Sequence, residues 1–196
     1  MAGPKATVML LRHRPPRIDP RPANTSKGFE HLDESWIAVL RWLLASRVEF
    51  VLVGPVARAV RGERGSRGPV SIVPAPYGRN LDRLARTLWS AHARMRVDTG
   101  AEGESATETI PIKLTVEKLV CGQHWTLRCG SHDLDVEGRQ PAAPRYQELL
   151  YEAARFELAG DVSVEVASPE DIEHYDHVRR TGVAPEMRVS RRPASA

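Results

Sequence analysis

The chain has 196 residues, of which 41% are hydrophobic and 27% charged, and its formal net charge is +3. These values suit one globular domain with tails and exclude a largely disordered chain. No run approaches the roughly 18 apolar residues of a membrane span, the opening residues lack the charge order of a secretory signal, and two cysteines cannot build a disulfide framework. We therefore expect a cytoplasmic protein that does not interact with membranes.

The positive charge is concentrated at the two ends of the chain. Residues 1–22 hold five basic residues against one acidic residue, and so do residues 179–196, so the body between them is acidic. We predict a flexible Pro- and Arg-rich arm over residues 1–27, one domain over residues 28–182 and a flexible basic tail over residues 183–196. Basic arms of this kind can attract nucleic acid.

The first half of the body alternates helical and strand patterns. A helix is expected after the capping residue Asp33, and the apolar run 48–53 predicts a strand that ends at Gly54. Pro55 then suits the first turn of a helix. Next come a loop over 62–68, a strand over 70–73, a helix capped by Asn80 and a loop over 98–109.

The second half continues the alternation. Residues 125–129 and 134–136 predict two strands of a hairpin, residues 145–154 a helix, and residues 162–166 a strand with period-two alternation. A last helix is expected from Ser168 to Arg180, stopping at Gly182. Interleaved strands and helices indicate an α+β or α/β fold.

Five segments come in an order that resembles the nucleotidyltransferase-like domains of the small bacterial and toxin-associated (toxin–antitoxin-like) kind. They are residues 48–57 (VEFVLVGPVA), 70–74 (VSIVP), 80–85 (NLDRLA), 133–136 (DLDV) and 166–172 (VASPEDI). The resemblance implies an α+β fold with a central mixed β-sheet flanked by helices. It also implies a nucleotide cleft between the Gly54 turn and the strand over 70–73.

Four positions depart from the pattern of that family. At the second position of the family's Gly-Gly or Gly-Ser turn, this chain has Pro55, which has no N–H to donate to a phosphate. At the two positions of the family's magnesium-binding Asp-x-Asp pair, this chain has Pro69 and Ser71. A basic residue of the family's last helix would fall near Asp176. No Asp or Glu lies between Glu63 and Asp82, so a small shift in alignment does not restore the pair.

We therefore predict a degenerate, catalytically inactive protein that needs no cofactor and acts by binding a nucleotide, a nucleic acid or a partner protein. Asp133 and Asp135 would be remnant carboxylates of the catalytic site. The candidate nucleotide-binding residues are Gly54, Arg58, Ser71 and Arg67, since arginines can hold a phosphate without metal.

Two alternatives stay open. The first is an active nucleotidyltransferase, which would use Asp133, Asp135 and a distant carboxylate such as Glu63 to hold Mg²⁺ and move a nucleoside monophosphate onto a hydroxyl. The second is a nucleic-acid-associated protein that binds through its two basic arms.

Two clusters could hold a metal, and for both we expect a plainer role. Zinc is bound by Cys and His, but a strand between the pairs separates Cys121 and His124 from Cys129 and His132, which favours buried thiols and surface histidines at two hairpin ends. In the last helix, His174 and His177 share a face near Asp171, which is typical of a solvated helix surface.

Overall fold

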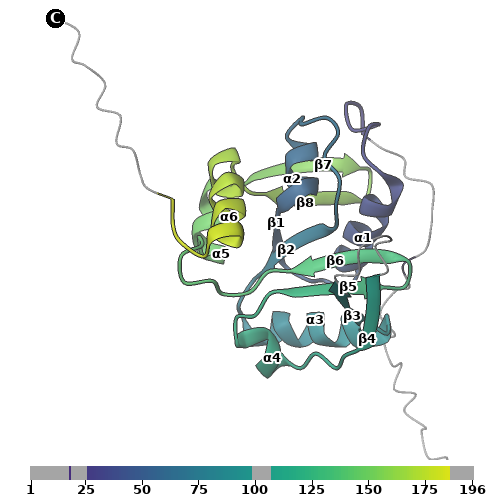
Figure 1. The fold of residues 1–196 in the computed structure, drawn as a ribbon. Coiled ribbons are helices and arrows are strands. Elements are labelled where there is room, and N and C mark those ends of the chain that lie inside the picture. The colour runs from purple at the N-terminus through teal and green to yellow at the C-terminus, as the bar shows by residue number, and fades with distance from the viewer. Residues whose placement is uncertain (1–17, 19–25, 99–106, 186–196) are drawn as a thin grey trace, which may run out of the picture.

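The computed structural model describes residues 18, 26–98 and 107–185. Strands of this part form one mixed eight-stranded sheet in the order β4-β3-β5-β6-β2-β1-β8-β7 (Figure 1). The strands are β1 (Phe50–Val53), β2 (Val70–Pro74), β3 (Arg94–Asp98), β4 (Thr107–Pro111), β5 (Trp125–Cys129), β6 (His132–Val136), β7 (Ala154–Ala159) and β8 (Val162–Val166). The helices are α1 (Glu34–Ala45), α2 (Gly54–Val60), α3 (Gly78–Ser90), α4 (Val116–Val120), α5 (Tyr146–Glu152) and α6 (Pro169–Thr181). The predicted α+β class, with a central mixed sheet flanked by helices, is thereby confirmed.

The position of β1 at the centre of the sheet explains why its residues are apolar. β1 lies between antiparallel β2 and parallel β8, and all four of its residues are buried. A strand covered on both faces needs a continuous apolar run, which is what Phe50–Val53 supplies. β2 is parallel to β6 on its other side. In Figure 1, α2 lies in front of β1 and β8, with α6 beside it.

Three helix ends form as the sequence predicts. The carboxylate of Asp33 accepts a hydrogen bond from the Ser35 N–H at 2.7 Å and so caps α1. Ser168 caps α6 by accepting from the Asp171 N–H, and α6 ends at Gly182, whose φ of 72° is left-handed. Both helices therefore begin, and α6 also ends, where their local chemistry places them.

The predicted cap at Asn80 is wrong. Helix α3 begins at Gly78, after Tyr77, and Asn80 lies within its first turn. The Asn80 side chain is buried and bonds to both the N–H and the C=O of Glu49, at 2.8 Å each, and to the Ala75 C=O. This amide therefore joins α3 to the backbone beside β1 and β2.

Other differences follow from strands that the sequence patterns did not indicate. Asp98 ends β3 and Thr107 begins β4, so the predicted loop over 98–109 is wrong at both ends, and residues 99–106 lie outside the described part. The helix predicted over 145–154 ends at Glu152, because Ala154 begins β7.

The predicted arms lie largely outside the described residues, and their flexibility stays a prediction. Within the first arm, Ile18 packs against the hydrophobic core, and the Ser26 N–H donates to the Leu158 C=O at 2.9 Å. In the described part, no helix is long and apolar enough to cross a membrane.

Candidate functional site at an arginine–carboxylate cluster

Three of the candidate residues lie in a row across neighbouring strands. Ser71 on β2 is opposite Val53, the last residue of β1, and on its other side it is in register with Asp135 on β6. Gly54 follows Val53 with a φ of 66°, and a Cβ added there would lie 2.9 Å from the Ser71 Oγ. Only glycine suits this turn, because it tolerates the positive φ and leaves room for the serine.

Asp135 is fully buried and held by two arginines from distant elements. Its Oδ1 accepts a hydrogen bond from the Arg96 Nη2 on β3 at 2.6 Å. Its Oδ2 accepts one from the Arg179 Nη2 on α6 at 2.8 Å. Charge-assisted bonds of this kind offset the large cost of burying a carboxylate.

Asp133 lies two residues earlier on the same face of β6. Its Oδ2 accepts a hydrogen bond from the Arg96 Nη1 at 3.1 Å, so Arg96 bridges the two aspartates. Arg128 on β5, directly opposite Asp133, forms a second ion pair with it. Both remnant carboxylates are therefore already paired with guanidinium groups.

Glu137 and His124 extend this arrangement. The Glu137 carboxylate is buried and lies 2.9 Å from the His124 Nδ1, while the Arg179 Nη2 lies 3.0 Å from the His124 Nε2. Since arginine can only donate, Nε2 is the acceptor, and Nδ1 carries the proton that bonds Glu137.

Arg179 is the centre of these contacts. Burial lowers the pKa of its guanidinium, but the charge of Glu137 and the hydrogen bond that Arg179 donates to Asp135 outweigh burial, so its pKa lies above the ordinary value. We call the whole set the arginine–carboxylate cluster; it consists of Arg96, His124, Arg128, Asp133, Asp135, Glu137 and Arg179.

The cluster does not fit the magnesium chemistry of nucleotidyl transfer. Magnesium is usually held by one or two carboxylates together with phosphate oxygens. Both oxygens of Asp135 face guanidinium groups, Pro69 supplies no ligand, and Ser71 supplies a neutral hydroxyl. Three carboxylates are balanced by three arginines, so the cluster has no surplus negative charge to attract a divalent ion.

The predicted arginines lie elsewhere. Arg58 on α2 is paired with Asp176 on α6 at 2.7 Å and with Glu63 at 3.4 Å, and the Asp176 hydrogen bond raises its pKa. It therefore joins two helices. Arg67 lines a cavity of about 560 Å³ between the start of α1, the 62–69 loop and the β5–β6 turn. Glu63 and Asp133 also line this cavity, whereas Asp135 does not.

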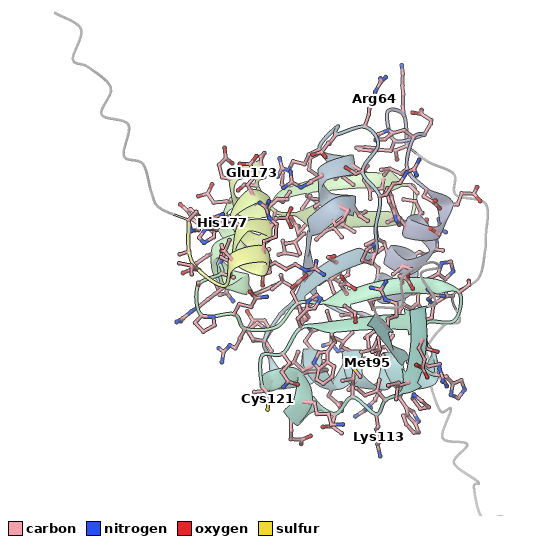
Figure 2. All side chains as sticks on the ribbon, in the orientation of Figure 1. Arg64, Met95, Lys113, Cys121, Glu173 and His177 are labelled. Carbon is pink, nitrogen blue, oxygen red and sulfur yellow. The ribbon has the colours of Figure 1, made fainter. Side chains whose placement is uncertain are left out.

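The Cys and His pairs do not form a metal site. Cys121 is exposed at the end of α4 (Figure 2), so the expectation that both thiols are buried is wrong for this residue. Cys129 is buried, and desolvation raises its pKa to about 12. In the described part of the chain, the one group of potential metal ligands joins His124 to Asp135 and Glu137.

The two histidines of the last helix have different surroundings. The His174 Nε2 lies 2.9 Å from the Ala142 C=O, and the Asp171 carboxylate accepts from the Ser168 hydroxyl that caps the helix. His177 lies on α6 away from the body of the protein (Figure 2).

Sequence reasoning missed the residues that surround Asp135. Arg96 lies on a strand that was not predicted, and His124 was considered only with the cysteines. Two signals were available. Asp133, Asp135 and Glu137 alternate with period two, which places them on one face of a strand. The resemblance would place a basic residue near Asp176, and Arg179 follows that position by three residues. Arg179 bonds to Asp135, whereas Asp176 pairs with Arg58.

No protein-family model matches the chain, and no curated protein matches it. Among solved structures, it is similar to a candidate nucleotidyltransferase from Thermotoga maritima, with 14% identity and a TM-score of 0.49, over 78% of this chain and 91% of that one. It is also similar to an antigenic nucleotidyltransferase-like protein from Paracoccidioides brasiliensis, with 19% identity and a TM-score of 0.43, over 83% of this chain and 72% of that one.

Proposed function

We propose that this chain is a nucleotidyltransferase-like protein that binds a nucleotide and does not transfer one. The observation that carries this proposal is the state of Asp135, whose two carboxylate oxygens accept hydrogen bonds from Arg96 and Arg179. A catalytic carboxylate must keep an oxygen for the metal that activates the attacking hydroxyl and stabilises the reacting phosphate. In this chain that capacity is already used by two side chains of the protein.

The cavity beside Arg67 has a size that suits a small-molecule ligand. Small-molecule sites usually measure about 300–1,000 Å³, and the cavity, at about 560 Å³, falls within that range. Two of its carboxylates are paired, Asp133 with Arg96 and Arg128 and Glu63 with Arg58. The third carboxylate of the lining, Asp33, accepts the Ser35 N–H at the start of α1. Arg67 has no hydrogen bond or ion pair with another described residue, so its guanidinium is available to a phosphate.

Isothermal titration of the full chain with the four nucleoside triphosphates, in Mg²⁺ and in EDTA, tests this proposal. We expect at least one triphosphate to bind equally well in both buffers, and no pyrophosphate to be released on incubation. Magnesium-dependent pyrophosphate release that is lost in Asp135→Asn would contradict the proposal and support the active alternative.

A matched pair of loop variants locates the ligand. Arg67→Gln should weaken binding by at least tenfold, because it removes the cation that faces the cavity. Arg64→Gln removes a neighbouring arginine of the same loop that does not line the cavity (Figure 2), and it should leave the affinity unchanged. Equal losses in both variants would indicate nonspecific charge attraction instead of a site.

Binding of nucleic acid through the basic arms is a second candidate, favoured by the charge at the two ends of the chain. It predicts a steep salt dependence in the full chain that disappears when residues 1–17 and 186–196 are removed together. Retention of nucleic-acid binding after this truncation would contradict it.

A further inference from the structure

We propose that a second cavity, at the carboxyl ends of β2 and β6, binds a small organic anion with an apolar body, such as an aromatic carboxylate. This cavity measures about 760 Å³, which is within the roughly 300–1,000 Å³ of small-molecule sites. It shares no lining residue with the Arg67 cavity. The proposal therefore goes beyond the nucleotide function and does not depend on it.

The second cavity lies where two neighbouring parallel strands end. Pro74 is the last residue of β2, Glu137 directly follows β6, and both residues line the cavity. The Arg67 cavity is at the other end of the same two strands, where Pro69 precedes β2 and Asp133 is the second residue of β6. In open α/β sheets, ligands commonly bind outside the carboxyl ends of the strands. The position of the second cavity is therefore one that suits a ligand.

Much of the lining is apolar, and it comes from four helices. Leu81 belongs to α3, Leu119 to α4, Tyr146 to α5 and Tyr175 to α6, and each of these residues is at least nine-tenths buried. Val120, which also lines the cavity, is 49% exposed, so the apolar lining extends to the surface of the protein. An apolar body is therefore the part of a ligand that this cavity would remove from water.

Two arginines of the lining indicate the charge of the ligand. Arg139 and Arg145 lie on the segment between β6 and α5, and both residues are exposed. Neither guanidinium donates a hydrogen bond to another described residue or forms an ion pair with one. The two carboxylates of the lining have partners, because Glu137 pairs with Arg179 and a Glu148 oxygen accepts the Arg145 N–H at 2.7 Å. The two guanidinium groups are therefore available to an anionic group of the ligand.

A matched pair of fluorescent probes tests both parts of this proposal. Anilinonaphthalene sulfonate joins an aromatic body to an anion, and phenylnaphthylamine has the same rings without the sulfonate. In fluorescence titrations of the full chain, we expect the sulfonate to bind about tenfold more tightly, because only the sulfonate forms charge-assisted hydrogen bonds with the arginines. An excess of naphthoate, an aromatic carboxylate, should displace it. Equal affinity of the two probes, or no displacement by naphthoate, would overturn the proposal.

Two double variants of equal net charge locate the site. Arg139→Gln with Arg145→Gln removes the free cations of the second cavity and should weaken binding of the sulfonate about tenfold, to the level of the uncharged probe. Arg64→Gln with Arg67→Gln removes two exposed arginines of the 62–69 loop and should leave the affinity for the sulfonate unchanged. Equal weakening in the two double variants would indicate nonspecific charge attraction and overturn the proposal.

Val120→Asp gives a second test that does not depend on the arginine variants. It places a negative charge in the lining at an exposed position, where a substitution has little effect on folding. It should weaken binding of both probes, and that of the sulfonate more strongly. Val183→Asp, at an exposed position outside the cavity, should match the wild type. Unchanged binding in Val120→Asp would overturn the proposal. Neither probe is a nucleotide, so the proposed function stands or falls separately.

Discussion

Arg179 and Asp135 are separated by 44 positions in the sequence and are joined by a hydrogen bond of 2.8 Å. The bond connects the last helix to a buried strand at the centre of the sheet. The other carboxylate oxygen of Asp135 accepts a hydrogen bond from a second arginine, Arg96 on β3. The last helix is therefore tied to the sheet through a carboxylate that in a metal enzyme would have to remain free.

Replacing this carboxylate should destabilise the fold strongly. Asp135→Asn removes the buried negative charge that faces two arginines, and leaves Arg96 with Asp133 and Arg179 with Glu137 as their remaining partners. Breaking a buried ion pair from one side costs about 3–5 kcal/mol, so the free energy of unfolding should fall by roughly 3 kcal/mol. Urea denaturation followed by circular dichroism measures this loss.

The matched control is Asp82→Asn, which breaks an exposed pair with Arg86 one helical turn away. Pairs of this kind contribute about 0.3–0.5 kcal/mol, so the midpoint should hardly move. Equal effects in the two variants would mean that burial of Asp135 does not determine the strength of its ion pairs.

The hydroxyl of Ser71 should contribute nothing to stability. It is buried without a partner among the described residues, and an unsatisfied buried polar group costs about 1–3 kcal/mol. Ser71→Ala should therefore leave the free energy of unfolding unchanged or raise it by up to about 1 kcal/mol. Ser168→Ala, which removes the cap of α6, should instead lower it by about 0.5–2 kcal/mol. A clear loss in Ser71→Ala would show that its Oγ has a partner.

Gly54 should tolerate no side chain while Ser71 is present. Gly54→Ala forces a positive φ on alanine and places a Cβ 2.9 Å from the Ser71 Oγ, at an expected cost of about 1–3 kcal/mol. Adding Ser71→Ala should recover part of this cost, because it removes the nearer of the two clashing atoms. Gly160→Ala has open space and an unexceptional φ, and should be nearly neutral. Strict additivity of the Gly54 and Ser71 changes in urea denaturation would contradict the contact.

The sequence predicts best where the signal is local. Caps at Asp33 and Ser168 and the apolar run of β1 depend on neighbours within a few residues, and they form as expected. The signal is weaker in β3 and β4. β3 (RMRVD) has only two apolar residues and β4 (TETIP) has one large apolar residue, and both strands gain their order from pairing, β3 with β5 and the two with each other.

The site was predictable only in part for the same reason. Gly54, Ser71 and Asp135 follow from the order of strands, so their adjacency could be expected from the resemblance. Arg96 and Arg179 reach Asp135 across 39 and 44 residues, and nothing in a local pattern distinguishes them from the other arginines of the chain. Long-range ion pairs of this kind emerge only from tertiary packing.

The two cysteines should differ sharply in reactivity and in their effect at alkaline pH. Burial raises the Cys129 pKa to about 12 from an ordinary value of 9.0, whereas Cys121 is exposed. Between these two values the unfolded chain loses the Cys129 proton and the folded chain keeps it, so stability falls as pH rises above about 9. The slope from this one group approaches about 1.4 kcal/mol per pH unit, and Cys129→Ala should remove it from urea denaturation series at pH 8–10.5.

Iodoacetamide should modify Cys121 alone in the native protein and both thiols in urea. Rapid native modification of Cys129, or an unchanged alkaline slope in Cys129→Ala, would contradict its place in the core.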